Sequence, residues 1–224
     1  MTATTLSGYA GRIASVRERI AIACARSDRD PATVTLLAVS KTQSSAAVME
    51  AIAFGIQDFG ENRVQEALEK QSQVGPGATW HLVGHLQTNK AKAAAGRFAI
   101  LHGIDSERVL IAVAQAATKV QRIMIEVNIG GEETKFGFTP SQLLPIVALA
   151  RTLPNIRLEG LMTVAPRHLD VEQVRPHFAG LRRLAHDSGL GSLSMGMTDD
   201  FEVAIEEGAT HIRIGRAIFG ERQV

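Results

Sequence analysis

Residues 34–60 read VTLLAVSKTQSSAAVMEAIAFGIQDFG and contain one complete copy of a pattern that runs through the chain. The apolar run at 34–40 predicts a buried strand, the Ala-rich segment at 45–54 predicts a helix that begins with serine, and the short run at 58–60 predicts a second strand. A strand, a helix and a strand in succession are typical of a βαβ unit, whose two strands lie parallel.

The same alternation continues to the C-terminus. Further strands are predicted at residues 81–83, 98–102, 123–129, 156–163, 193–195 and 211–214. Helices are predicted at residues 8–26, before the first strand, and then at 63–73, 89–95, 106–119, 141–152, 171–186 and 199–207. Eight strands that alternate with helices in ~200 residues fit a single-domain (β/α)8 TIM barrel with an extra N-terminal helix. A doubly wound open sheet is the alternative. No linker-like stretch divides the chain, so residues 1–224 are predicted to form one domain.

The composition is that of an ordinary globular protein. Hydrophobic residues make up 45% of the 224 residues and charged residues 21%, which argues against a disordered or coiled-coil chain. The 24 basic and 23 acidic residues leave a net charge of +1 and form no block of like charge. Neither nucleic acid nor an anionic membrane is therefore an expected partner.

The cysteine content and the N-terminus predict the cellular compartment. Cys24 is the single cysteine, so the chain can form neither an internal disulfide nor a cysteine-rich metal site. Arg12, Arg17 and Arg19 interrupt the apolar residues of the first helix, which leaves no recognisable signal peptide, and no apolar run approaches ~18 residues. We therefore expect a cytoplasmic protein that does not span a membrane.

In a (β/α)8 barrel the binding groups follow the carboxyl ends of the strands, and a lysine follows the first of them. Alternation places Lys41 on the same face as Leu37 and Val39, where its ammonium group is difficult to hydrate. Desolvation lowers the pKa of a lysine and leaves a neutral amine, which can attack an aldehyde to form a Schiff base. The alternative is a lysine whose ammonium group reaches solvent at the rim.

The last predicted strand carries an arginine on an unexpected face. His211, Arg213 and Gly215 share one face, while Ile212 and Ile214 share the other. Because the outer face of a barrel strand packs against helices, the isoleucines should point outward and Arg213 into the barrel, where its charge needs an acceptor. That acceptor is either a ligand or a carboxylate of the protein, such as Glu126, Glu61 or Asp58.

The loops after the last two predicted strands have the features of a phosphate site. Residues 194–198 read SMGMT, in which Gly196 allows the backbone to approach a ligand and Thr198 can cap the next helix. Backbone N–H groups at a helix N-terminus bind phosphate, and barrels commonly place that site in these two loops, here at 194–198 and 215–217. A plain strand–turn–helix connection explains the same residues.

A metal site and several common chemistries are not expected. His81 and His85 have the spacing of paired zinc ligands on a helix, but Gly84 and the preceding apolar run predict a strand there. The chain contains no nucleotide-binding phosphate loop, no dinucleotide fingerprint and no nucleophile elbow, so nucleotide chemistry and acyl transfer have no support.

Five segments carry a resemblance to a known family. They are LLAVSKT at 36–42, FGENRVQE at 59–66, WHLVGHLQTNK at 80–90, EGLMTV at 159–164 and LSMGMTDDFEVAIEEGATHIRIGRAIFG at 193–220. In these segments the chain resembles the pyridoxal phosphate homeostasis proteins, single-domain relatives of the barrel half of alanine racemase. Arg63 and His85 depart from the family pattern, which often has tyrosine and proline there.

The resemblance implies a barrel that holds pyridoxal 5′-phosphate, with Lys41 as the Schiff-base lysine and Arg213 facing the pyridine nitrogen. It implies further cofactor contacts from Asn62, His81 and Met162 at other strand ends, and from the phosphate-binding residues Ser194, Gly196, Met197, Thr198 and Gly215. Lys135 matches a lysine near the family's site; the alternative is a solvated loop residue. An arginine beside the ring nitrogen keeps that nitrogen unprotonated, because adjacent positive charges repel, and the ring is then a weaker electron sink.

Two functions from different classes fit this site: an amino-acid racemase, and a carrier without strong catalytic activity that buffers the reactive aldehyde. A two-base racemase needs a second proton donor opposite the lysine, and in alanine racemase that tyrosine comes from a separate domain. Tyr9 is the only tyrosine here and, like Cys24, falls in the first helix. We therefore predict a monomeric carrier that takes part in intracellular cofactor homeostasis, with apo-enzymes that depend on the cofactor as possible recipients. A Schiff-base aldolase without cofactor would need an acid/base pair that the sequence does not identify.

Overall fold

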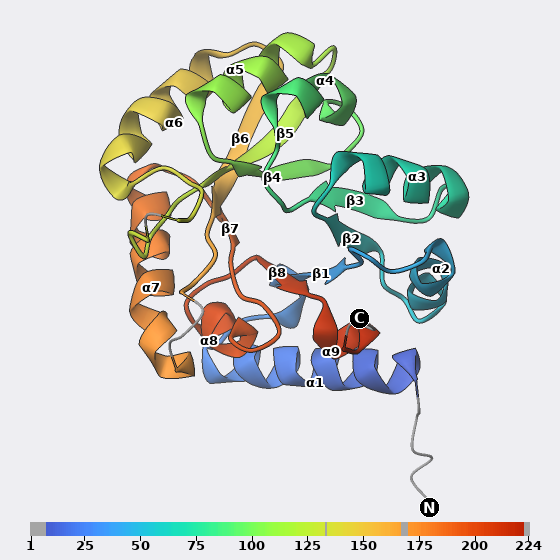
Figure 1. The fold of residues 1–224 in the computed structure, drawn as a ribbon. Helices are drawn as coiled ribbons and strands as arrows, with labels where there is room; N and C mark the ends of the chain where they lie inside the picture. Colours follow the sequence, from blue (N-terminus) through green and yellow to red (C-terminus); the bar gives the residue numbers. More distant parts are fainter. Residues whose placement is uncertain (1–7, 133, 167–169, 222–224) are drawn as a thin grey trace, which may run out of the picture.

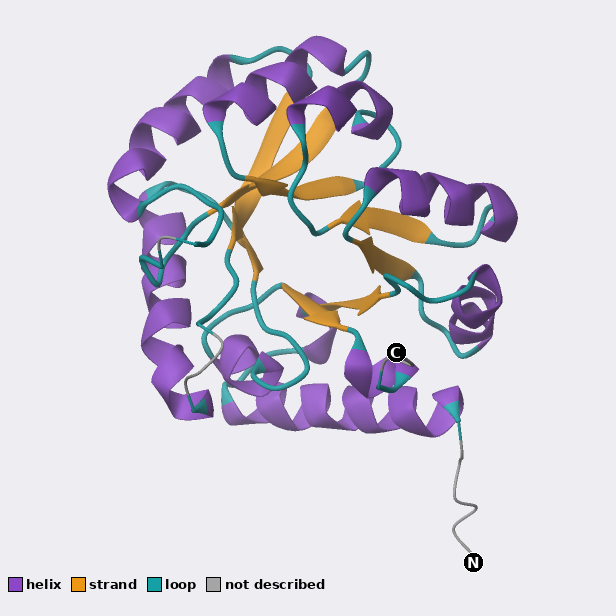
Figure 2. Cartoon of the chain, in the orientation of Figure 1, coloured by secondary structure: helices purple, strands orange, loops and turns teal. Residues whose placement is uncertain are grey.

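Eight parallel strands close into a barrel in the order β1 to β8, and helices surround it (Figures 1 and 2). The structure is a computed structural model that describes residues 8–132, 134–166 and 170–221. The strands are β1 (Thr35–Val39), β2 (Asp58–Glu61), β3 (Thr79–Leu82), β4 (Ile100–Ile104), β5 (Gln121–Glu126), β6 (Ile156–Met162), β7 (Ser192–Ser194) and β8 (His211–Ile214). The pairing of Leu37 with Arg213 belongs to the ladder between β1 and β8 that closes the ring. The predicted barrel is confirmed, and the open sheet is excluded.

Helices follow every strand, so each crossover lies outside the barrel. The α-helices are α1 (Tyr9–Arg26), α2 (Ser45–Ala53), α3 (Val64–Val74), α4 (Ala91–Ala94), α5 (Glu107–Ala116), α6 (Leu143–Thr152), α7 (Val171–Asp187), α8 (Phe201–Glu206) and α9 (Arg216–Phe219). Short 3-10 helices are η1 (Pro31–Thr33), η2 (Thr88–Lys90) and η3 (Pro140–Gln142). The short helix α9 and these 3-10 turns did not follow from the sequence pattern.

The predicted extra helix lies where the barrel is thinly covered. Because α9 has only four residues, it cannot shield the outer face of β8 alone, and α1 lies across α8 and α9 along that side (Figure 1). Ile13, Val16 and Ile20 form the buried stripe of α1 at helical spacing. The side chain of Arg12 donates to the Ile218 carbonyl oxygen at 2.6 Å and ties α1 to α9.

The apolar core is divided between the outside and the inside of the barrel. The large cluster lies between strands and helices and includes Ile212 and Ile214, both fully buried. A small second cluster of Ile100, Met124 and Met162 lies apart from it. Among the described residues, no helix is both long and apolar enough to cross a bilayer.

A close contact between β6 and β7 makes a glycine necessary. Gly160 pairs with Ser192, and a Cβ atom at Gly160 would lie 1.8 Å from the Ser192 carbonyl oxygen. Gly160→Ala is therefore expected to lower the free energy of unfolding by about 1–3 kcal/mol, because the strands must separate. Gly191→Ala is the control, since its Cβ would meet no atom within 4 Å. Equal stability of the two variants in urea unfolding would contradict this contact.

Candidate functional site

Because all strands are parallel, their carboxyl ends meet at one end of the barrel, and Lys41 lies there. It follows β1 in a turn and is half-buried. Val39 pairs with Gly60 of β2, and the Ser40 N–H continues that ladder to the Gly60 carbonyl oxygen at 3.0 Å. Lys41 and Asn62 therefore follow neighbouring strands at similar height. The lowered pKa of Lys41 stays a prediction.

A buried lysine that sequence analysis missed anchors the turn around Lys41. Lys70 of α3 donates to the Ser40 carbonyl oxygen at 2.6 Å and to Glu61 and Glu66, each at 2.8 Å. The Ser40 hydroxyl donates to the same Glu61 oxygen at 2.7 Å. Burial raises the pKa of Glu61, although the hydrogen bonds from Lys70 and Ser40 lower it.

The next residue in the turn is held by the same group of side chains. The Thr42 N–H donates to the Glu66 carboxylate. Thr42 adopts a φ of 66°, which is strained for a β-branched residue. The residues on both sides of Lys41 are thus tied to the network centred on Lys70. The sequence contains a signal for the burial of Lys70, because Val64, Ala67 and Lys70 share one helical face.

Arg213 points into the barrel, as the alternation in β8 predicts. It is 6% exposed, and it donates to the Ser194 hydroxyl and to the Thr163 carbonyl oxygen, both at 2.8 Å. Within the described part of the chain, none of the three suggested carboxylates forms an ion pair with it. Burial lowers the pKa of Arg213, while the charges of Asp200 and Glu126 raise it. Its charge is therefore buried among neutral protein acceptors.

The turn at 194–198 lies beside β8 but differs in detail from the prediction. Gly196 has a φ of 92°, and its Cβ would lie 2.6 Å from Cβ of Ala204, so packing against α8 requires the glycine. The predicted cap at Thr198 is wrong: Asp200 is the N-cap residue of α8, because the helix begins two residues later than expected. Asp200 accepts the Met197 N–H at 2.6 Å.

Other backbone N–H groups in the two loops remain available. In the described chain, the N–H groups of Thr198 and Ala217 donate to no protein acceptor. The loops are adjacent, since the Arg213 N–H donates to the Gly196 carbonyl oxygen at 3.0 Å. Gly215 has a negative φ and is the N-cap residue of α9. These loops therefore present amide donors at one edge of the barrel.

His81 lies deeper in the barrel than its expected place at a strand end. The strand β3 begins two residues earlier than predicted, and His81 faces Asp58, the first residue of β2. Both ring nitrogens have protein partners: Nε2 contacts the Asp58 carboxylate at 3.1 Å, and Nδ1 contacts His102 Nε2 at 3.0 Å. Both His81 nitrogens thus have protein partners, and the predicted contact of His81 with the cofactor stays a prediction.

The remaining predicted residues lie around the mouth. Met162 is 1% exposed and pairs with Ser194 across the sheet. Lys135 donates to the Ala165 carbonyl oxygen at 3.0 Å and pairs with Glu132, so it ties the loop after β5 to the loop after β6 and is not freely solvated.

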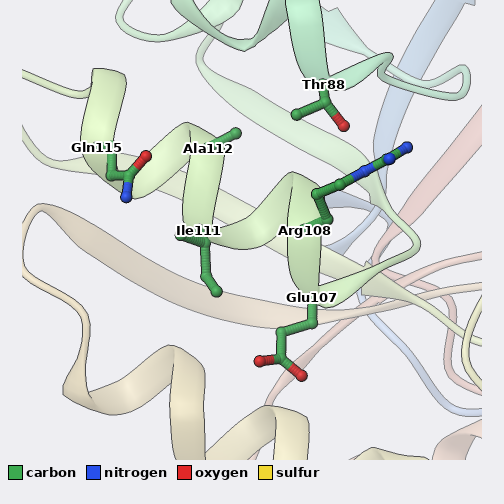
Figure 3. Close-up of a pocket in the computed structure, with 6 residues that line it drawn as sticks. All are labelled: Thr88, Glu107, Arg108, Ile111, Ala112 and Gln115. Atoms are coloured by element: carbon green, nitrogen blue, oxygen red, sulfur yellow. The ribbon is translucent and has the colours of Figure 1, made fainter.

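Two cavities lie outside the centre of the mouth. Asn62 lines the larger one, of about 620 Å³, together with Arg63 and His85, the two departures from the family pattern. A second hollow of about 440 Å³ lies beside the outer face of α5, and its lining includes Arg108, Ile111 and Thr88 (Figure 3). The predicted cofactor residues do not line this second hollow.

Tyr9 and Cys24, both in α1, lie away from the strand ends. Tyr9 packs edge-on against Phe219 at a ring distance of 5.8 Å, and Cys24 is buried in α1. His85 pairs with Asp105 and stacks on Phe136. No group of three or more His, Cys, Asp or Glu side chains in the described residues is arranged to hold a metal ion.

Glu126, the last residue of β5, is a second site residue that sequence analysis missed as a binding candidate. Its side chain is buried, and burial, assisted by the charge of Asp105, raises its pKa to about 7. Arg213 and His85 oppose this shift. The signal was the charged residue that ends the apolar run IMIE.

Glu126→Gln should change how stability depends on pH. A raised carboxyl pKa means that the folded chain binds the proton more tightly, so the wild type loses stability as the pH rises from about 4.5 to about 7. Above pH 7 the raised pKa lowers the free energy of unfolding of the wild type by roughly 3 kcal/mol, and Glu126→Gln should not show this decrease. Urea unfolding across this pH range measures it, with exposed Glu69→Gln as control. Parallel profiles for wild type and Glu126→Gln would contradict the assignment.

Comparisons with known proteins identify the family of the chain. It matches the family described as "Alanine racemase, N-terminal domain" over residues 13–223. A protein of Aquifex aeolicus named "Pyridoxal phosphate homeostasis protein" is 42% identical over 222 residues, which cover 95% of this chain and 97% of that protein.

Solved structures agree with the sequence matches. PipY of Synechococcus elongatus is 35% identical and covers 95% of this chain and 100% of its own, with a TM-score of 0.86 without and 0.81 with bound pyridoxal phosphate. Alanine racemase of Bartonella henselae is 12% identical with a TM-score of 0.69, covering 95% of this chain and 64% of its own, and shares the fold alone. The chain therefore belongs to the alanine racemase N-terminal domain family and, within it, to the pyridoxal phosphate homeostasis proteins.

Proposed function

We propose that this chain binds pyridoxal 5′-phosphate at the carboxyl ends of its strands, holds it reversibly through Lys41 and thereby buffers the cofactor in the cell. The observation that carries the proposal is Arg213, a cation 6% exposed in the barrel whose hydrogen-bond acceptors among the described residues are neutral and which has no ion pair there. A ligand that brings an acceptor and a negative charge compensates such a group. PipY, at 35% identity, is described with pyridoxal phosphate bound.

The residues at the mouth fit the different parts of this cofactor. Thr198 and Ala217 offer N–H groups that donate to no acceptor among the described residues, and such groups in adjacent loops suit a phosphate. Arg213 supplies donors suited to the pyridine nitrogen, and Met162 supplies apolar surface. Lys41 follows β1, which pairs with β8 on one side and, on the other, with β2, the strand that Asn62 follows. Asn62, Ser194, Gly196, Met197 and Gly215 complete the proposed site.

Each residue of the site has one task in this proposal. When bound, the cofactor supplies an aldehyde carbon, with which a primary amine condenses with loss of water. Lys41 Nζ forms that Schiff-base bond, and the network of Lys70 holds the turn on either side of Lys41. Arg213 donates toward the ring nitrogen and disfavours its protonation, because two neighbouring cations repel. The ring then withdraws electrons weakly, which suits storage more than carbanion chemistry.

A role without strong catalysis is favoured over the alternative, an amino-acid racemase. Racemisation by two bases needs a second proton donor opposite Lys41, and Tyr9 packs on Phe219 outside the barrel. We expect purified protein with added pyridoxal phosphate to develop an imine absorption band but to racemise alanine no faster than free cofactor. A racemase rate well above that level and dependent on Lys41 would refute the carrier.

The cellular setting is part of the same proposal. A single, buried cysteine supports the cytoplasm as the compartment. The proposal has the chain act there as a monomer that passes the cofactor to apo-enzymes. Size-exclusion chromatography with light scattering measures the oligomeric state, and a dimer mass would contradict this part.

A further inference from the structure

A chain of buried polar side chains crosses the interior of the barrel and ends on Arg213. The Arg213 guanidinium donates to the Ser194 hydroxyl of β7 at 2.8 Å, and that hydroxyl contacts His102 Nδ1 of β4 at 2.9 Å. His102 Nε2 contacts His81 Nδ1 of β3 at 3.0 Å, and His81 Nε2 contacts the Asp58 carboxylate of β2 at 3.1 Å. We call these five residues the interior relay.

The interior relay is shielded from water except at one end. Ser194 and His102 are 0% exposed and His81 is 3% exposed, whereas the Asp58 side chain is 28% exposed. Burial holds the pKa of His102 well below its ordinary value, and the nearby charges of His81, His211 and Arg213 lower it further. His102 is therefore a neutral ring with one N–H and one acceptor nitrogen, and a neutral His81 has the same pair of groups.

The two ends of the relay impose a single direction on its hydrogen bonds. A carboxylate can only accept, so His81 carries its proton on Nε2 and accepts at Nδ1. His102 must then donate from Nε2 and accept at Nδ1, which leaves the Ser194 hydroxyl as the donor to His102. Arginine can only donate, so the Ser194 oxygen accepts from Arg213. Every bond thus donates toward Asp58.

We infer that Asp58, His81 and His102 are positioning residues for Arg213: their one-way chain directs the Ser194 hydroxyl proton to His102 and so orients the lone pairs of that oxygen toward the guanidinium. The Thr163 carbonyl oxygen holds a second guanidinium nitrogen at 2.8 Å. Two fixed acceptors on one side of the planar group orient its remaining N–H groups. The relay is a property of the unliganded chain; only the identity of the ligand group that Arg213 faces rests on the proposed function.

His211 also faces the relay but is not a member of it. Its ring lies 5.6 Å from that of His102 and 6.3 Å from that of His81, measured between ring centroids. Its Nδ1 pairs with the Thr210 hydroxyl at 2.8 Å. Burial, assisted by His81, lowers the pKa of His211 to about 4, so it adds no charge beside the relay at neutral pH.

Nitrogen NMR on the unliganded protein with labelled histidine tests the inference directly. Near neutral pH, His81 and His102 should both be neutral Nε2–H tautomers, with their signals identified through His81→Gln and His102→Gln. A neutral Nδ1–H form or an imidazolium as the main species at either residue would overturn the relay.

An isosteric variant at Asp58 distinguishes an effect of hydrogen-bond direction from an effect of packing. An amide at position 58 can donate as well as accept, so Asp58→Asn should allow the Nδ1–H tautomer to appear at His81 and His102. Asp105→Asn is the matched control, because Asp105 pairs with His85 outside the relay. Wild-type tautomer populations in Asp58→Asn would overturn the inference, since packing alone predicts no change for an isostere.

The cofactor gives a second readout. Asp58→Asn should weaken binding of pyridoxal phosphate roughly three- to tenfold, the loss expected for about one net hydrogen bond, while Asp105→Asn keeps the wild-type affinity. Unchanged affinity in Asp58→Asn would contradict the positioning of Arg213. If the wild type binds no cofactor at all, the proposed function fails, and the tautomers of the unliganded protein still decide the relay.

Discussion

Lys41→Ala is expected to abolish the imine absorption band with added pyridoxal phosphate and to weaken binding by at least roughly tenfold, or 1.4 kcal/mol. The reason is that alanine has no amine to condense with the aldehyde, so only the contacts from Arg213 and the two loops remain. Absorption spectroscopy and equilibrium binding measure the two effects.

Two control variants separate the chemistry of Lys41 from its charge. Lys41→Arg keeps a cation but cannot form the bond, because guanidinium stays protonated, and it should also lack the band. Lys90→Ala removes a lysine from the neighbouring cavity and should keep the band. A full band in Lys41→Ala, or its loss in Lys90→Ala, would contradict the assignment.

Lys70→Met should lower the free energy of unfolding by about 3–5 kcal/mol, because it leaves the buried Glu61 without its cation. For a chain of this size the melting temperature should fall by roughly 10 °C. The turn around Lys41 should loosen as well, since Lys70 holds Ser40 and, with Glu66, Thr42. Thermal unfolding by circular dichroism measures the first effect.

A double variant tests whether the uncompensated charge causes the loss. Lys70→Met with Glu61→Gln removes both charges and should recover most of the stability, because a neutral pair needs no counter-ion. The band with pyridoxal phosphate should stay weaker than in wild type, since methionine cannot donate to the Ser40 carbonyl oxygen. A double variant as unstable as Lys70→Met would show that lost packing is the cause.

Alternation along the strands was sufficient to predict both the barrel and the inward arginine. Ile212 and Ile214 lie in the outer core and Arg213 between them faces inward, because a barrel strand has an apolar outer face whatever lies inside. The alternation of strand and helix predicts the topology for a related reason: parallel strands need a crossover, and each crossover carries one helix.

The positions of side chains along the barrel axis could not be predicted in the same way. The apolar run around His81 is short, so the sequence could not predict the height of this residue, which pairs with Gly60 and contacts Asp58 at the start of β2. The choice between Thr198 and Asp200 as the cap depended on where α8 begins, which tertiary contacts decide. Glu66 lies four residues before Lys70 on the same helix, but Ser40 and Glu61 follow or belong to other strands, so no local pattern could pair them with Lys70. The groups that shift the pKa of Glu126 are likewise distant in sequence.

Borohydride reduction of the protein with added pyridoxal phosphate, followed by peptide mass mapping, tests the central claim most directly. Reduction converts the reversible bond between the aldehyde and an amine into a stable adduct whose position can be read. We predict one reduced adduct, on Lys41. An adduct spread over surface lysines, or confined to another residue, would contradict the proposed site.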